Sequence, residues 1–170
     1  MKPATNRFAL LAMVLLVAAV AAYWYWSPYL TMRAVTRDLQ TEGPAKLDAY
    51  VDYPKVRENV KKQFRKMLVD RGSRGGEEFQ LVSGAVNDMV RPESLPEKMA
   101  RGRLFNPMAR VGYFPDHEGE LTWVIEREGL NRFIARDARV KDQEPAPGYV
   151  FDRYGLTNWI LTDIRFEEPD

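Results

Sequence analysis

The 170-residue sequence contains no cysteine and a single histidine, His117. The absence of cysteine excludes disulfide bonds, a thiol nucleophile, a zinc–cysteine site and a thiol redox pair. One histidine also excludes every catalytic or metal-binding motif that requires two. A folded domain in this chain must therefore be stable through packing alone.

The motifs of common enzyme sites are missing or incomplete. His117 lies between Asp116 and Glu118, a pattern that could supply acid–base or metal-binding groups but is more typical of a solvated hairpin turn. None of the four serines has nucleophile-elbow spacing, and no phosphate-binding or calcium-binding loop is complete. We therefore expect no catalytic residue, no metal and no cofactor.

Charge is absent from residues 8–26, a run of nineteen residues near the N-terminus. At about 1.5 Å per residue, a helix of this length spans the roughly 30 Å hydrocarbon core of a bilayer. We predict a transmembrane signal anchor over residues 1–27 and one exported domain over residues 28–170. The anchor residues are Phe8, Leu11, Leu15 and Val20 within the run and Tyr23, Trp24, Tyr25 and Trp26 at its end.

Lys2 and Arg7 precede the apolar run, and positive residues favour the cytoplasmic side of a membrane. The aromatic cluster at the other end suits the headgroup level. We predict a single-pass protein of the inner (cytoplasmic) membrane, with its N-terminus in the cytoplasm and its domain in the periplasm. A signal peptide cleaved at residues 19–21 (Ala-Val-Ala) is the alternative, and it would export the same domain.

The remaining charges are unevenly distributed. Residues 54–110 contain thirteen Lys or Arg against seven Asp or Glu, whereas residues 116–170 contain seven against thirteen. A nucleic-acid-binding domain would carry a basic excess throughout, so we expect no nucleic-acid partner. One predicted helix has a basic face that offers a surface for an anionic lipid or an acidic protein, with an ordinary solvated face as the alternative. This candidate basic surface consists of Lys55, Arg57, Lys61, Lys62, Arg65 and Lys66.

Helical periodicity follows the apolar run. Ser27 as N-cap and Pro28 at the first helical position predict a new helix that ends at Gly43 and Pro44. The strongest pattern covers residues 54–69, where Val56, Val60, Phe64, Met67 and Leu68 form one apolar stripe opposite the basic face. Shorter or weaker patterns predict helices at residues 46–51, 77–90 and 92–100.

Near residue 103 the apolar period changes from 3.6 to 2. Short β-branched and aromatic segments separated by turn residues predict strands at residues 111–114, 120–127, 130–138, 149–153 and 159–166. We therefore predict an α+β fold in which several helices precede a four- to five-stranded antiparallel sheet. The aromatic residues of these strands either fill the core or line a small-molecule or enzymatic pocket; they are Trp123, Phe133, Phe151 and Trp159.

Several short patterns, taken in order, resemble a known family. They are YWSPY at residues 25–29, DYP at 52–54 with Val-Arg at 56–57, VRPESL at 90–95, NRF at 131–133 and the closing stretch at 154–165. This set is similar to the proteobacterial envelope family of domain of unknown function 2939 (DUF2939), over most of residues 23–166. The resemblance implies a membrane-anchored domain that faces the periplasm, and it assigns no activity or catalytic residue. We expect a non-catalytic binding or envelope-interaction module.

Overall fold

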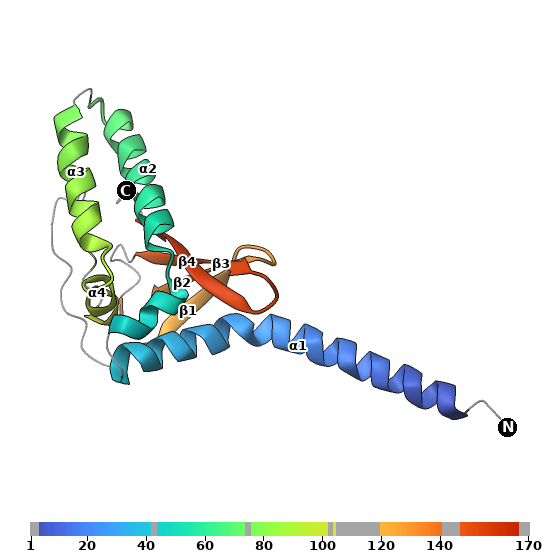
Figure 1. Cartoon of the computed structure of the whole chain (residues 1–170). Coiled ribbons are helices and arrows are strands. Elements are labelled where there is room, and N and C mark those ends of the chain that lie inside the picture. The colour runs from blue at the N-terminus through green and yellow to red at the C-terminus, as the bar shows by residue number, and fades with distance from the viewer. Residues whose placement is uncertain are drawn as a thin grey trace.

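The computed structural model describes residues 4–41, 44–73, 76–101, 104, 120–140 and 147–166. Within this part of the chain, helices come first and strands second (Figure 1). The helices are α1 (Ala4–Thr41), the 3₁₀ helix η1 (Pro44–Tyr50), α2 (Tyr53–Asp70), α3 (Gly76–Met89) and α4 (Leu95–Arg101). The strands are β1 (Trp123–Arg127), β2 (Arg132–Asp137), β3 (Gly148–Tyr154) and β4 (Asn158–Arg165).

The four described strands form an antiparallel meander in the order β1-β2-β3-β4. This arrangement confirms the predicted α+β fold and its antiparallel sheet. The strand predicted at residues 111–114 and the turn around His117 lie outside the described residues. The turn glycines Gly129 and Gly155 have φ angles of 80° and 68°, a region that disfavours residues with a Cβ atom.

The prediction that a new helix begins at Ser27 is wrong, because α1 runs without interruption from Ala4 to Thr41 with Pro28 inside it. A proline in a helix interior lacks the N–H that would bond the carbonyl four residues earlier. Here the Ser27 hydroxyl donates to that carbonyl, on Trp24, at 2.9 Å instead of capping a new helix. The helix therefore continues past the proline.

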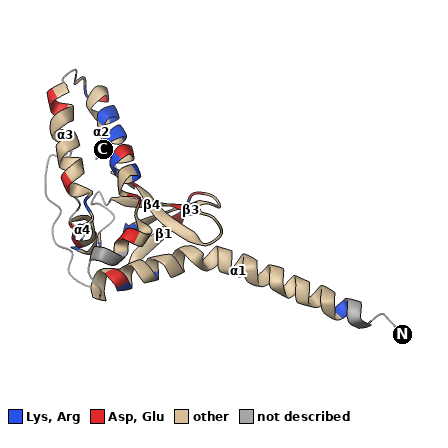
Figure 2. Cartoon of the chain, viewed as in Figure 1, with Lys and Arg blue, Asp and Glu red and all other residues tan. Residues whose placement is uncertain are grey.

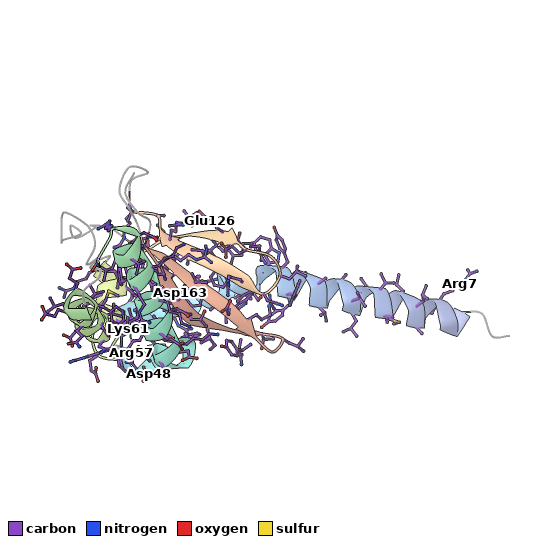
Figure 3. All side chains as sticks on the ribbon, turned by 90° about the horizontal axis from the view of Figure 1, so that it is seen from above. Arg7, Asp48, Arg57, Lys61, Glu126 and Asp163 are labelled. Carbon is purple, nitrogen blue, oxygen red and sulfur yellow. The ribbon has the colours of Figure 1, made fainter. Side chains whose placement is uncertain are left out.

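The second half of α1 is part of the domain, while the first half projects away from it (Figure 3). Met32 and Val35 are 2% and 1% exposed. By contrast, the most apolar 18-residue window of α1 has a mean hydropathy of 2.2 and none of it is buried. The helix thus combines a bare apolar end with a buried stripe.

Helix α2 covers the free edge of β4. Asp52, which precedes the helix, donates its N–H to the carbonyl of Leu161 at 3.0 Å. Further along α2, the Asn59 amide donates to the Thr162 carbonyl at 2.9 Å, and the Gln63 amide donates to the Ile164 carbonyl at 3.0 Å. An exposed sheet edge is a template for unwanted pairing, so these side chains both satisfy the edge and close it.

The aromatic residues of the sheet fill the space between the strands and the helices. Phe133 and Phe151 stack with ring centroids 4.9 Å apart, and the Trp159 ring meets Phe133 edge-on at 4.9 Å. Trp123 is half-buried and meets Tyr149 edge-on at 5.5 Å. Of the two interpretations of these aromatic residues, the structure therefore supports the packed core.

Candidate functional site

The contact between α1 and the end of the sheet is the most unusual polar arrangement in the described residues. Pro28 leaves the Trp24 carbonyl without its backbone donor, and Arg153 of β3 donates to that carbonyl from Nη2 at 3.3 Å. The same nitrogen lies 3.3 Å from the Ser27 hydroxyl oxygen, which also accepts from Trp159 Nε1 at 3.0 Å. Two residues far away in the sequence thus bind the helix at its proline.

Aromatic stacking accompanies these hydrogen bonds. The Arg153 guanidinium carbon lies 4.5 Å from the centroid of the Trp24 ring and 4.2 Å from that of Trp159. Arg127 of β1 repeats the arrangement, since its guanidinium lies 4.6 Å from the Tyr25 ring centroid and donates to the Tyr25 carbonyl. We call these residues the arginine–aromatic junction.

The junction is partly withdrawn from water. The Nε atoms of Arg127 and Arg153 are buried and find no hydrogen-bond partner among the described residues. Burial, followed by repulsion from Arg127, lowers the pKa of Arg153 against an opposing effect of Tyr23. An arginine remains charged in proteins, so partial burial of the Arg153 guanidinium costs solvation free energy. The two stacked rings and the carbonyl contacts must offset this cost.

Sequence reasoning placed Trp24 and Tyr25 in a membrane-interface belt but missed the arginines that meet them. The signal that could have indicated such a contact was Pro28. A proline within a continuous helix leaves a carbonyl without its usual donor and so requires one from elsewhere in the chain. Nothing in the sequence says which donor supplies it.

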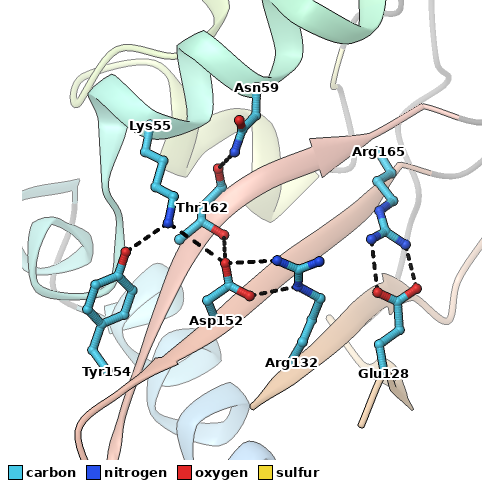
Figure 4. A network of polar contacts seen from close by, with 8 residues as sticks. All are labelled: Lys55, Asn59, Glu128, Arg132, Asp152, Tyr154, Thr162 and Arg165. Atoms are coloured by element: carbon cyan, nitrogen blue, oxygen red, sulfur yellow. Dashed lines mark hydrogen bonds and ion pairs between the residues drawn. The ribbon is translucent and has the colours of Figure 1, made fainter.

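A second polar cluster lies where the start of α2 meets the strands (Figure 4). Arg132 of β2 donates to both carboxylate oxygens of Asp152, at 2.7 and 3.2 Å. The Thr162 hydroxyl donates to the same carboxylate at 2.8 Å, and Lys55 Nζ lies 3.9 Å from it. Lys55 also donates to the Tyr154 hydroxyl at 2.9 Å. The cluster therefore links α2 to three strands.

The contacts within this cluster favour the charged forms of Asp152 and Lys55. Burial alone would raise the pKa of Asp152, but hydrogen bonds from Arg132 and Thr162 outweigh it and lower the pKa. The hydrogen bond with Tyr154 raises the pKa of Lys55. A general acid or base works best with a pKa near the operating pH, so neither group suits proton exchange at pH 7.

A bidentate ion pair follows next to the cluster, between the end of β4 and the turn after β1 (Figure 4). Arg165 donates to the two carboxylate oxygens of Glu128 at 2.5 and 2.9 Å. The hydrogen bond from Arg165 lowers the pKa of the Glu128 carboxyl. Both side chains are more than a third exposed, so the pair orients the turn without adding much stability.

The predicted basic surface lies along α2, where Figure 2 shows Lys and Arg gathered. Part of it faces the protein. Besides Lys55, Arg57 donates to the Val90 carbonyl at 3.1 Å, and the Arg65 guanidinium lies 4.2 Å from the centroid of the Phe79 ring. These three cations join α2 to the sheet and to α3.

In the other part of the basic surface, Lys62 and Lys66 are exposed and Lys61 is half-buried. Lys62 pairs with Glu58 at 2.8 Å across one helical turn. Lys61 and Lys66 have no ion-pair or hydrogen-bond partner among the described residues. We call Lys61, Lys62 and Lys66 the lysine face.

Among the described residues, two depressions that open to solvent lie against the sheet. One of about 370 Å³ lies between α1 and β1 and is lined by Arg33, Thr36 and Trp123, among others. Another, of about 350 Å³, lies beside Leu130 and Asp152. Within the part of the chain that the structure describes, no group of three or more acidic or histidine side chains could hold a metal ion.

The predicted anchor residues from Phe8 to Val20 all lie on the bare half of α1. Phe8 is 73% exposed and Leu15 61%. By length and composition this half meets the criteria for a membrane span, as an N-terminal signal sequence also would. The helix therefore fits the predicted anchor by length and composition.

Comparison with known proteins gives one family. The profile described as "Protein of unknown function (DUF2939)" matches residues 17–97, which confirms the family predicted from the sequence. No curated protein and no solved structure matches the chain. The matched region includes the end of the apolar run, the proline of α1 and the whole lysine face.

We predict that Arg153→Lys destabilises the full chain by about 1–2 kcal/mol. Lysine keeps the charge but lacks the planar group that stacks between two indole rings while it donates to the helix. Denaturant unfolding in a mild detergent measures the change. Arg33→Lys, on an exposed position of α1, is the control and should stay within about 0.5 kcal/mol of the wild type. Equal stability of the two variants would show that the junction contributes nothing.

We predict that Asp152→Asn destabilises the protein at pH 7 and that the difference disappears in acid. The lowered pKa of Asp152 means that its stabilising charge is present above the ordinary value of 3.8 and is lost as the pH falls through the lower folded-state value. Unfolding curves between pH 7 and the acid range measure the difference. Asp70→Asn, at the exposed end of α2, should follow the wild type throughout. A constant gap at every pH would contradict the prediction.

Proposed function

Because residues 17–97 form a DUF2939 region, we propose that this chain is a membrane-anchored interaction module without catalytic activity. In this proposal the bare half of α1 crosses the inner (cytoplasmic) membrane, the N-terminus lies in the cytoplasm and the domain faces the periplasm. Lys2 and Arg7 support this orientation, because positive residues next to a span favour the cytoplasm.

One observation carries the proposal: a single helix supplies both the apolar span and part of the domain core. Met32 and Val35 are buried only about two turns after Trp26, the last residue of the apolar run. A flexible linker would let the domain tumble, whereas a continuous helix with the arginine–aromatic junction fixes its position. The arrangement suits a protein that presents one surface at a set height above the membrane.

The alternative, a small-molecule or enzymatic pocket between helices and sheet, has less support. Its site would need an opening between Phe133, Phe151 and Trp159, and these rings contact one another directly. In the polar cluster, hydrogen bonds from Arg132 and Thr162 lower the pKa of Asp152, so this carboxyl stays ionised. Binding through an outer surface is therefore the better proposal.

The lysine face is the surface that we propose for binding. Figure 1 places α2 and α3 on the side of the sheet away from the bare half of α1. A cation this far from the span gains little from anionic headgroups, since their potential decays within about 10 Å. An acidic segment of another periplasmic protein is the partner that fits, and an anionic lipid is the competing outcome.

Labelling of introduced cysteines tests the topology, and the absence of native cysteine leaves no background. We predict that a membrane-impermeant maleimide added to intact spheroplasts modifies Leu81→Cys, a position 76% exposed on α3. Lys2→Cys should react only after the membrane is permeabilised. Reaction of Lys2→Cys in intact spheroplasts would reverse the orientation. Recovery of Leu81→Cys protein in the soluble fraction, without residues 1–21, would support cleavage instead.

A photo-crosslinking residue at Lys66 tests the lysine face in native membranes. We predict a discrete protein adduct that Lys61→Glu together with Lys62→Glu removes and that high salt weakens, because a charge-based contact is screened. The matched control carries the crosslinker at Leu81 on the exposed side of α3. An adduct that survives the charge reversal, or one formed with lipid alone, would contradict an acidic protein partner.

A further inference from the structure

Two hairpin tips lie at the end of the sheet that faces the bare half of α1. One joins β1 to β2 around Gly129, and the other joins β3 to β4 around Gly155. Both Figure 1 and Figure 3 show these tips beside the middle of α1, where the helix begins to project from the domain. The Arg153 N–H donates to the Asn131 carbonyl at 2.8 Å, so the two hairpins are joined at their ends.

Each tip carries an exposed leucine. Leu130 is 66% exposed and Leu156 is 81% exposed, the highest value among the exposed large hydrophobic residues described. Single exposed apolar residues are common on protein surfaces, but here α1 adds Trp26 and Tyr29, which are 57% and 43% exposed. The leucines and the helix aromatics lie at the same end of the domain.

The arginine–aromatic junction sets the height of these tips. Arg127 precedes the first tip and contacts Tyr25, while Arg153 precedes the second and contacts Trp24. Trp24 and Tyr25 lie in the aromatic cluster at the end of the apolar run, where such side chains prefer the bilayer interface. If residues 8–26 span the bilayer, the junction holds both tips at the level of the headgroups.

The charged side chains near the tips all have contacts within the protein. Arg132 is held by Asp152, and Glu128 is held by Arg165. The guanidinium groups of Arg127 and Arg153 are occupied by rings and by the carbonyls of α1. Arg127 and Arg153 therefore keep their positive charges, but their guanidinium groups face the rings and carbonyls of α1. The leucines are the side chains that the tips expose, and we expect their contact with the bilayer not to require anionic lipid.

We propose that Leu130 and Leu156 insert into the headgroup region of the bilayer that surrounds the anchor, forming a second membrane contact for the domain. The proposal rests on α1 acting as the membrane anchor. An amphipathic surface at the interface binds through the apolar area that it buries. With the helix as one point of attachment and the two tips beside it, the domain cannot rotate freely about the helix axis.

The test places an environment-sensitive fluorophore on single cysteines of the full chain in phosphatidylcholine nanodiscs. Probes at Leu130→Cys and Leu156→Cys should show blue-shifted emission and stronger quenching by lipids with a nitroxide near the headgroup than by lipids with one deep in the acyl chain. Leu81→Cys on α3 is the matched solvent control, with emission typical of water and no quenching. Circular dichroism checks that each labelled protein is folded.

A probe at Leu15→Cys separates this inference from the anchor on which it rests. Deep quenching at Leu15 with water-like emission at both tips would overturn the inference and leave the anchor intact. Water-like emission at Leu15 would overturn the anchor as well. Replacing part of the phosphatidylcholine with phosphatidylglycerol should leave tip quenching unchanged. Quenching that appears only with phosphatidylglycerol would assign the contact to arginines and contradict the role of the leucines.

Discussion

The carbonyl of Trp24 is the group on which the arrangement of this protein depends. Pro28 cannot donate to it, and a polar group left unsatisfied away from water is costly. The Ser27 hydroxyl and the Arg153 guanidinium both donate to this carbonyl, at 2.9 and 3.3 Å. A defect in one helix thus becomes the point at which the sheet attaches.

The same attachment explains how the domain can be built on a helix whose first half is apolar and exposed. The half of α1 before the proline exposes its apolar side chains, and the half after it buries Met32 and Val35. The aromatic rings of Trp24 and Trp159 enclose Arg153 between the two parts. The exposed apolar half of α1 and the domain core are therefore joined through one turn of helix.

Helix α2 closes the edge of the sheet at β4. Asn59 and Gln63 donate to edge carbonyls of β4, so the last strand is closed to further pairing. The apolar stripe of α2, which includes Val56 and Phe64, is buried in the core, and the lysine face lies outside it. A domain with closed edges and a filled core has its outer charges and its hairpin tips available for recognition.

Much of the architecture followed from sequence because it depends on local patterns. The apolar run, the 3.6-residue stripe of α2 and the change to period 2 reflect how side chains alternate along helices and strands, which any short segment reveals. The sequence also indicated that the strand aromatics belong to the core, although a pocket lined by the same rings stayed an open alternative until their contacts of about 5 Å were known.

What tertiary structure alone decided concerns pairs of residues far apart in the chain. Ser27 and Pro28 have a local preference for a helix start, but the hydroxyl instead serves Trp24, Arg153 and Trp159 inside a continuous helix. Likewise, the basic face of α2 looked uniform in sequence, and only packing showed that Lys55, Arg57 and Arg65 contact other elements of the protein, whereas Lys61 and Lys66 have no such partner among the described residues. Local propensity is a free-energy difference of about 1 kcal/mol, and contacts between distant residues readily exceed it.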